Sequence, residues 1–270
     1  MRDIEIHLPS IIYLYDGGRA ANLDLDEIAK YIKRNLGNIE IEFRKDFVTH
    51  WLSLQSPTVK EKVANTLANK VARCKVRKIE TKEQGFEPLP GEIDYERRSL
   101  FYKHFGILYD GFELRTIFTE LIPANERGFV FCHIIFTNQI FGTWDENDKR
   151  YHARVSVYGF PSIVSTSGVV EAPAKPREFY LKQQMGRSLT TLKKEFKGKF
   201  IDYDDTRLTE VLKGYTMQAL FFHMMGEPFC EDKNCRLYNA HWQEEVMQAQ
   251  LDSGYEFCDQ HRMILNKIKK

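Results

Sequence analysis

The sequence predicts an α/β fold in which helices flank a mixed β-sheet and a small Cys/His-rich subdomain ends the chain. Residues 11–15, 24–36 and 39–43 have the patterns of a strand, a helix and a strand, which is the order of a right-handed crossover. Residues 129–136 are almost continuously apolar, as is typical of a central strand buried on both faces. Three of the five cysteines lie close together near the C-terminus, so we expect that segment to form the small subdomain beside the sheet.

The clearest single element is the helix predicted at 24–36. Asp24 and Glu27 have the spacing of a capping box, and Gly37 follows as a stop. The apolar residues between them recur at helical spacing and form one stripe. The strand at 11–15 is β-branched and aromatic, and it ends at a glycine-containing turn.

The remaining elements complete a compact unit with two regions. A second helix is expected at 58–73, and the charged, Pro- and Gly-containing residues 80–95 are expected to form an exposed connection. This gives an N-terminal α/β region at 1–95 and a second region at 96–270 that carries the C-terminal subdomain. Within the second region we expect strands at 155–158 and 162–165, and helices at 176–185, from Asp204 or Asp205 to 225, and at 240–250.

Composition excludes several classes of protein. A net charge of +1 gives no overall electrostatic attraction to nucleic acid or to an anionic membrane. No run of 18 apolar residues is present, so no transmembrane helix is expected. The polar N-terminus and the odd number of cysteines favour a reduced, cytoplasmic protein over a secreted disulfide framework. The sequence leaves the oligomeric state open.

The C-terminal cysteines predict a metal site together with one histidine. Cys230 and Cys235 are separated by four residues, and Cys258 and His261 by two, so each pair can be presented by one short turn. Thiolates and imidazoles are the ligands that zinc prefers, and four of them close its coordination. The prediction is a structural Cys3His zinc site. The alternative is a set of buried free cysteines beside an unrelated histidine.

A second group of candidate ligands lies at the end of the helix that precedes this cluster. His223 lies on the apolar stripe of the helix and has Glu227 at position i+4, so both could face one metal if the helix continues that far. Pro228 opposes this, because the residue before a proline avoids the helical region. The alternative for His223 is a core histidine with a satisfied hydrogen bond.

The third candidate region is the charged segment from Asp145 to His152. It follows a strand pattern and belongs to a stretch, 142–154, that carries Trp144 and an unusual density of charged residues. One interpretation is a solvated hairpin loop with internal ion pairs. The other is the rim of a substrate-binding or metal-binding site, because loops at strand ends commonly carry such sites.

The C-terminal third resembles the archaemetzincins, a metzincin-type family of zinc metallopeptidases known from archaea. Their pattern is His-Glu-x-x-His-x-x-Gly-x-x-His, followed at once by Cys-x4-Cys-x-Met and later by Cys-x2-Cys. Superimposing the first two cysteines on Cys230 and Cys235 places Gly226 on the family's glycine. His223 then falls on its second histidine, and Cys258 on the first cysteine of the later pair.

This chain departs from the family pattern at the catalytic positions. Ala219 stands at the first histidine, Leu220 at the general-base glutamate and Phe229 at the third histidine. Leu237 replaces the methionine, and His261 replaces the last cysteine. Alanine, leucine and phenylalanine neither bind zinc nor accept a proton. The resemblance therefore implies a metzincin-like fold that keeps the zinc knuckle and lacks the usual hydrolytic mechanism.

Three functions are compatible with these residues. The first is a metallopeptidase homologue that binds a peptide or protein in the former catalytic cleft, and it is favoured because a fold can outlive its chemistry. The second is an active metal-dependent hydrolase whose site combines His223 and Glu227 with the loop from Asp145 to His152. The third is a zinc-stapled regulatory or interaction module. Zinc knuckles can bind RNA, which would suit the third function, but the near-neutral charge gives no expectation of a nucleic-acid or membrane partner.

Overall fold

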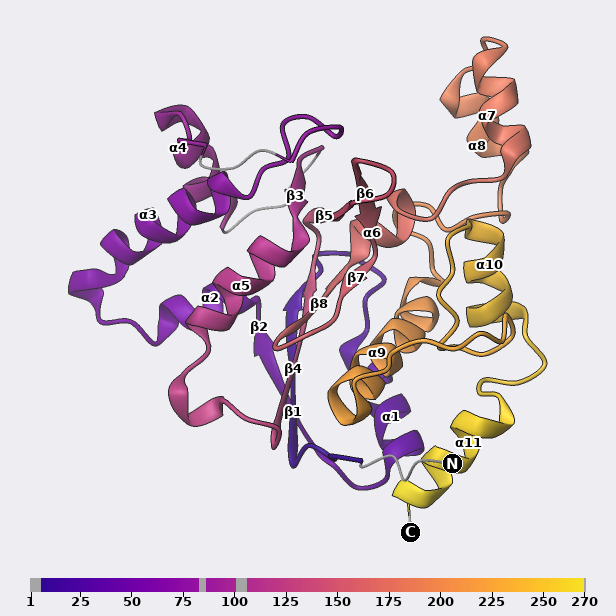
Figure 1. Cartoon of the computed structure of the whole chain (residues 1–270), viewed down its shortest axis with the longest axis horizontal. Coiled ribbons are helices and arrows are strands. Elements are labelled where there is room, and N and C mark those ends of the chain that lie inside the picture. Colours follow the sequence, from indigo (N-terminus) through magenta and orange to yellow (C-terminus); the bar gives the residue numbers. More distant parts are fainter. Residues whose placement is uncertain (1–5, 83–85, 101–105, 270) are drawn as a thin grey trace.

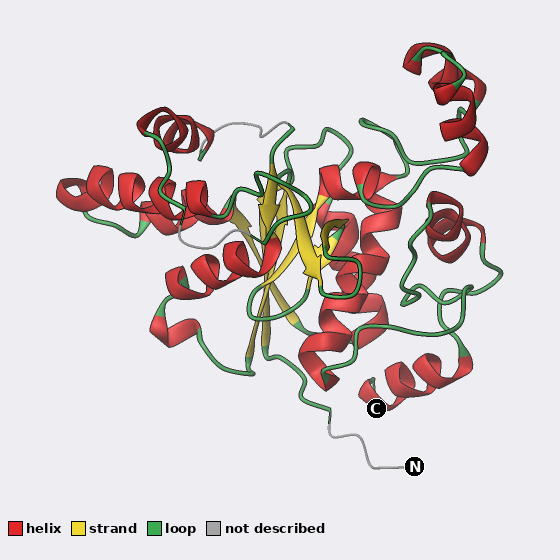
Figure 2. Cartoon of the chain, turned by 45° about the horizontal axis from the view of Figure 1, so that its top comes forward, coloured by secondary structure: helices red, strands yellow, loops and turns green. Residues whose placement is uncertain are grey.

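Helices cover both faces of a twisted mixed sheet in the computed structural model, which describes residues 6–82, 86–100 and 106–269 (Figures 1 and 2). The main sheet has five strands in the order β2-β1-β4-β8-β7, and only the edge strand β7 runs antiparallel to its neighbour. These strands are β1 (Ile11–Gly17), β2 (Glu40–Lys45), β4 (Phe131–Thr137), β7 (Ser156–Val157) and β8 (Ser162–Ser165). The first strand of the chain therefore lies inside the sheet.

A second, smaller sheet is separate from the main one. It has three strands in the order β3-β5-β6, and β6 is an edge strand that pairs antiparallel with β5. The strands are β3 (Leu108–Asp110), β5 (Ile140–Asp145) and β6 (Arg150–Arg154). The outer edge of β6 is the one that matters for the site described below.

The side chains of β1 alternate between two hydrophobic cores, one on each face of the main sheet. Ile12 and Leu14 belong to the core that contains α1 and α9, whereas Tyr13 and Tyr15 belong to the core that contains α2, α3 and α5.

The helices are α1 (Leu25–Leu36), α2 (Phe47–Ser53), α3 (Pro57–Arg73), α4 (Pro90–Ser99), α5 (Gly111–Leu121), α6 (Thr166–Glu171), α7 (Arg177–Gln184), α8 (Leu189–Glu195), α9 (Leu208–Met225), α10 (Gln243–Met247) and α11 (Asp259–Ile268), with short helical turns at Ala124–Glu126 and Gln248–Asp252.

Local sequence signals placed several elements correctly. The helix predicted at 24–36 is confirmed as α1: the Asp24 side chain accepts a hydrogen bond from the main-chain nitrogen of Glu27 at 2.9 Å, and Gly37 ends the helix with φ at 89°. The helices predicted at 58–73 and 176–185 are confirmed as α3 and α7. The strand expected at 129–136 is β4, which begins at Phe131 and is buried along almost its whole length, whereas Phe129 and Val130 lie in the preceding turn and are exposed.

Three expectations were wrong at least in part. The helix expected to begin at Asp204 or Asp205 begins at Leu208, because Asp204 has φ at 59°, outside the helical region, and Arg207 is the N-cap residue. The exposed connection expected at 80–95 ends in a helix, because Pro90 occupies the first turn of α4 and Glu92 accepts a hydrogen bond from the main-chain nitrogen of Leu89 at 2.8 Å; residues 83–85 of that stretch lie outside the described residues. The alternation at 39–43 predicted a half-buried strand, and Ile39 and Ile41 of this stretch do pack against the core, but Phe43 is exposed and the next residue, Arg44, is buried. The reason is a bidentate ion pair between Arg44 and Glu126, with both nitrogen–oxygen distances at 2.7 Å.

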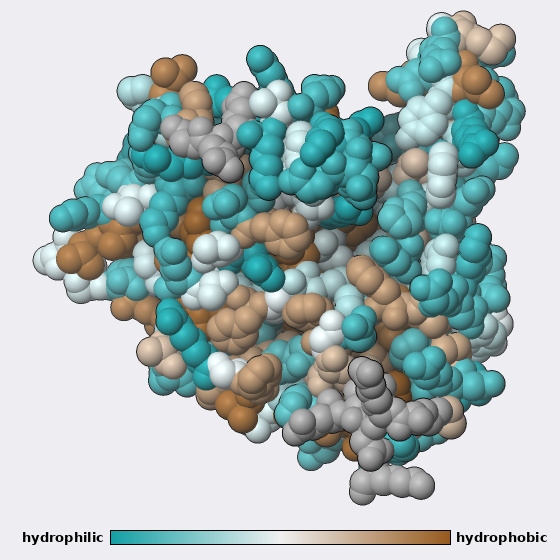
Figure 3. Space-filling view, viewed as in Figure 1, coloured by the Kyte–Doolittle hydropathy of each residue, from teal (hydrophilic) through white to brown (hydrophobic). Residues whose placement is uncertain are grey.

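Hydrophobic side chains on the surface occur in small groups separated by hydrophilic ones (Figure 3). Within the described part of the chain, no helix is both long and apolar enough to cross a bilayer. The C-terminal segment after α9 packs against α1 and α9 on one face of the sheet, and it carries the cysteine cluster (Figure 1).

Candidate functional site

Four metal-ligating side chains converge after the end of α9. One ligand atom from each of Cys230, Cys235, Cys258 and His261 lies within 4.8 Å of all the others. The Cys230 and Cys258 sulfurs are 3.8 Å apart, and the Cys235 sulfur is 3.7 Å from Nδ1 of His261. Tetrahedral zinc coordination would separate two sulfurs by about 3.8 Å and a sulfur from a nitrogen by about 3.6 Å. The four side chains therefore fit a metal ion of this kind, although the Cys258 sulfur lies closer, 3.0 Å from the same nitrogen.

A turn and a helix N-terminus present the two ligand pairs. The main-chain nitrogen of Cys230 donates to the oxygen of Leu237 at 2.9 Å, which folds the segment between them into a closed loop that brings Cys235 back toward Cys230. Cys258 is the N-cap residue of α11, and His261 lies in its first turn. Local structure thus brings together the two ligands of each pair. The tertiary fold is needed only to bring the loop that carries Cys230 and Cys235 against α11.

Burial disfavours charged ligands when the four side chains are without a cation. Burial raises the pKa of the Cys230 and Cys235 thiols, and the neighbouring Cys258 raises the pKa of Cys230 further. Burial lowers the pKa of His261. A metal binds thiolates and neutral imidazole, so a dication would supply the charge that stabilises the deprotonated thiols and would release their protons.

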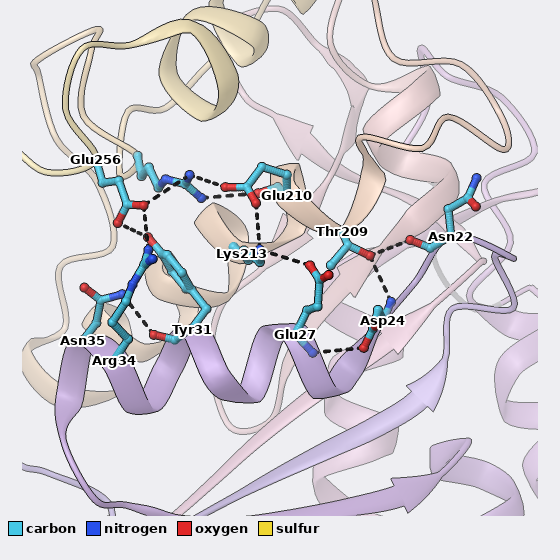
Figure 4. A network of polar contacts seen from close by, with 11 residues as sticks. Asn22, Asp24, Glu27, Tyr31, Arg34, Asn35, Thr209, Glu210, Lys213 and Glu256 are labelled. Atoms are coloured by element: carbon cyan, nitrogen blue, oxygen red, sulfur yellow. Dashed lines mark hydrogen bonds and ion pairs between the residues drawn. The ribbon is translucent and has the colours of Figure 1, made fainter.

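A polar network fixes the metal-binding segment to α1 and α9 (Figure 4). Arg236, next to Cys235, forms an ion pair with Glu210 of α9. Glu256, close to Cys258, accepts a hydrogen bond from Arg34 of α1 at 2.6 Å. A residue next to each ligand pair, Arg236 or Glu256, therefore connects the cluster to α9 or α1.

The residues predicted for a relocated site do not come together. Nε2 of His223 lies 2.8 Å from the main-chain oxygen of Phe129, and since a carbonyl only accepts, this nitrogen carries the proton and is occupied. Helix α9 ends at Met225 with Gly226 in the left-handed conformation at φ 78°, so Glu227 leaves the helix and is exposed. The i, i+4 relationship on which the second hypothesis depended is absent. Within residues 6–82, 86–100 and 106–269, the Cys3His cluster is the one group of three or more such ligands that converges.

The segment from Asp145 to His152 forms the turn of the β5–β6 hairpin. The Asp145 carboxylate accepts from the main-chain nitrogens of Asn147 and Asp148 at 2.8 and 3.1 Å, which caps the turn. Lys149 forms an ion pair with Glu146 at 3.0 Å. Nε2 of His152 is 2.9 Å from the Asp148 carboxylate, but this nitrogen is buried and forms no hydrogen bond among the described residues. The turn has internal ion pairs, as the first interpretation expects, and Arg150 and His152 also line a cleft, as the second expects.

The positions that the resemblance assigns to catalysis differ in their surroundings. Ala219 and Leu220 are fully buried in the core between α9 and the main sheet. Phe229 is exposed. On α9, therefore, neither Ala219 nor Leu220 is in contact with water.

A cleft of about 820 Å³ lies between the β5–β6 hairpin, α9 and residues 238–242. Its aromatic wall is built from Tyr158, Phe222 and Phe229. The ring centroid of Tyr158 is 6.2 Å from that of Phe222 and 5.8 Å from that of Phe229. The Tyr158 hydroxyl donates to Gln218 of α9 at 2.5 Å, which fixes the wall to the helix. His152 also lines the cleft. Sequence reasoning did not find the wall, because Tyr158 is more than 60 residues away along the chain from Phe222 and Phe229.

The opposite side of the cleft is formed by the outer edge of β6. The main-chain nitrogen of Tyr151 donates outward to Ile79 at 2.8 Å, so Tyr151 faces away from β5. Main-chain groups alternate along an antiparallel strand, and Ala153 therefore also directs its nitrogen and oxygen away from β5. Ala153 lines the cleft, and so do the basic residues Arg150 and Arg154 of the same strand.

Comparison with known proteins gives one family and one solved structure. The model of DUF6775, described as a probable metallopeptidase family, matches residues 8–268. The crystal structure of an archaemetzincin from Methanopyrus kandleri is similar over 97% of this chain and 96% of that chain, with 12% sequence identity and a TM-score of 0.45. No curated protein matches the chain significantly.

Proposed function

The chain belongs to the probable metallopeptidase family, and we propose that it is a non-catalytic member that binds an extended peptide in the cleft beside β6. The outward-facing main chain of Ala153 carries the proposal, because a peptide can pair with it and extend the smaller sheet. The Cys3His cluster holds a structural zinc in this proposal, since four protein ligands leave no open position for water.

Three observations support the absence of hydrolysis. None of the eight histidines is followed by glutamate, so the sequence contains no His-Glu-x-x-His motif. Ala219 and Leu220 lie in the core, where a metal-bound water would have no access. Nε2 of His223, the remaining residue of the pattern, is bound to a main-chain oxygen. A catalytic zinc needs three protein ligands and a water, and these positions supply one imidazole.

The lining of the cleft suggests the side chains of the peptide. Tyr158, Phe222 and Phe229 form an aromatic surface, so an apolar or aromatic side chain of the ligand would pack there. Arg150 and Arg154 flank Ala153 on the opposite side and favour an acidic side chain nearby. We therefore infer an extended peptide with an aromatic residue and an acidic residue on neighbouring positions.

The substitution Ala153→Pro tests this proposal. Proline removes the outward main-chain donor, and it is tolerated at strand edges where that donor does not belong to the ladder. The matched control is Ala153→Ser, which retains the donor at the same position. Peptides would first be selected from a random heptapeptide phage library on the wild type, and their affinity would be measured by fluorescence anisotropy.

We expect Ala153→Pro to lower the affinity of the selected peptides at least about tenfold, by loss of the pairing hydrogen bonds and of register. Ala153→Ser should leave it within about twofold. Equal affinities for the two variants would contradict strand pairing. Zinc-dependent cleavage of a selected peptide that is abolished in His223→Ala would contradict the non-catalytic assignment.

A further inference from the structure

Helices α7 and α8 form a hairpin that projects from the rest of the molecule (Figure 1). The hairpin has its own small core, made of Phe179, Leu192, Phe196 and Phe200. The main-chain nitrogen of Ala174 donates to the oxygen of His241 at 2.9 Å, and that of Ile201 donates to the Gln243 side chain at 3.0 Å. Both ends of the hairpin are therefore held by the same short segment of the body, and its far end lies away from the sheet.

The charge of this hairpin differs strongly from that of the whole chain. Residues 175–199 contain eight lysines and arginines and two glutamates, a net charge of +6, whereas the whole chain carries +1 and the remainder therefore −5. Arg187, Lys194 and Lys197 are exposed and have no ion pair within 4 Å among the described residues. The near-neutral net charge of the whole chain gave no expectation of an anionic partner. That net charge is the sum of a positive hairpin and a negative remainder.

Three aliphatic side chains are exposed at the far end of the hairpin. Leu181, Met185 and Leu189 have relative exposures of 58, 82 and 54%. They follow one another at intervals of four residues across the end of α7 and the start of α8. In Figure 3 the projecting lobe carries hydrophobic side chains among hydrophilic ones. Nothing in the described part of the protein covers them.

We propose that the far end of the α7–α8 hairpin binds the surface of an anionic lipid bilayer. Leu181, Met185 and Leu189 enter the boundary between headgroups and acyl chains, and the surrounding lysines and arginines bind the anionic headgroups. Helix α7 has eight residues and is about 12 Å long. This length is close to the Debye length of about 8–10 Å at physiological salt, so the basic residues along the helix are near enough to a bound bilayer to attract its anionic headgroups.

The shape and chemistry of the hairpin favour this partner over two others. A nucleic acid would satisfy the positive charge, but its phosphate backbone offers no apolar environment for exposed aliphatic side chains. An acidic protein would need a concave apolar site of its own to receive a projecting end. A bilayer interface supplies negative charge and apolar depth together, and it adapts to a convex surface. The proposal is independent of peptide binding in the cleft.

Flotation and co-sedimentation with vesicles test the proposal on the full-length protein. The vesicles consist of equal parts phosphatidylglycerol and phosphatidylcholine, with pure phosphatidylcholine vesicles for comparison. One variant removes the apolar end: Leu181→Ser, Met185→Ser and Leu189→Ser. Its matched control replaces exposed hydrophobic residues elsewhere: Leu54→Ser, Leu89→Ser and Met263→Ser.

A second pair of variants separates local charge from total charge. The hairpin variant carries Arg187→Glu, Lys194→Glu and Lys197→Glu. Its matched control makes the same change in total charge at exposed lysines of α1 and α3: Lys30→Glu, Lys60→Glu and Lys62→Glu. The probes for other partners are a double-stranded DNA fragment and polyglutamate.

We expect wild-type protein to bind the anionic vesicles and not the neutral ones, and 0.5 M salt to weaken binding, because it shortens the Debye length to about 4 Å. The apolar-end variant and the hairpin charge variant should each lose at least about tenfold in affinity, and both controls should remain within about twofold. Absence of binding to anionic vesicles at 0.1 M salt would overturn the proposal. The proposal would also be overturned if substitution of Leu181, Met185 and Leu189 did not change binding to the vesicles. Binding to DNA or polyglutamate, but not to vesicles, would overturn it as well.

Discussion

Nε2 of His223 and the main-chain oxygen of Phe129 lie 2.8 Å apart, so a residue at a metal-ligand position of the family pattern instead connects α9 to the segment that enters β4. Burial lowers the pKa of this histidine, which keeps the ring neutral with its proton on the bonded nitrogen. The imidazole thus has a structural role in this chain.

The first prediction concerns metal content. We expect about one zinc per chain in the wild type and the same in His223→Ala, measured by elemental analysis, because the Cys3His ligands are unaffected. The substitution should lower the free energy of unfolding by about 1 kcal/mol through loss of one hydrogen bond. Two metals in the wild type and one in the variant would contradict the non-catalytic assignment.

The second prediction concerns the ligands themselves. Cys235→Ser should abolish zinc binding and loosen residues 226–261, because the metal closes this loop against α11. Cys132→Ser is the matched control, since Cys132 is equally buried but lies in β4, far from the cluster in sequence and outside it. Hydrogen exchange should rise in the C-terminal segment of the first variant alone. Retention of zinc by Cys235→Ser would exclude the Cys3His site.

The third prediction concerns stability as a function of pH. Burial lowers the pKa of His133 to about 4, and its ring accepts a hydrogen bond from Tyr15 at 2.9 Å and donates to the oxygen of Glu126 at 3.0 Å. In the unfolded chain the pKa is about 6.5, so the unfolded state binds the proton first and stability falls as pH decreases from about 6.5 to 4.

Denaturant unfolding at pH 7 and pH 5 measures this effect. Between these values the His133 contribution should amount to about 2 kcal/mol in the wild type. His133→Gln lacks the titrating ring, so its stability should change less over the same interval. The difference between the two proteins removes the contributions of the other histidines. An identical pH dependence would show that His133 is not the responsible group.

The fourth prediction concerns the buried ion pair of β2. The Arg44 side chain is 6% exposed and pairs with Glu126, and it also contacts the exposed Glu42 at 2.6 Å. Glu126→Gln should cost about 3 kcal/mol or more, because it leaves a buried charge without its bidentate partner. Glu42→Gln provides the control and should cost less than about 1 kcal/mol. Similar costs in thermal unfolding would contradict the burial of Arg44.

The sequence was informative where the signal is local. The cap of α1 depends on two residues three apart, and each ligand pair of the metal cluster is presented by one turn. Features that depend on distant segments were not predictable. Arg44 is buried because Glu126 reaches it from another part of the chain. The cleft joins the aromatic wall to β6 across segments that no periodicity connects.

The charged hairpin shows a different limit of sequence reasoning. Its residues were expected to form one helix and a following segment, and the total charge of +1 concealed the local excess. The excess lies in one contiguous stretch, 175–199, so a count over that stretch shows it, whereas the total for the whole chain does not.

The central position of β1 also has a consequence for biosynthesis. β1 pairs with β2 on one side and with β4, which begins at Phe131, on the other. During translation, β1 and β2 would therefore be complete while the second edge of β1 still lacks its partner. An unpaired strand edge with alternating large apolar residues is a template for intermolecular pairing. Ribosome-bound chains that end before Phe131 should therefore need chaperone protection, and release from it should coincide with the emergence of β4.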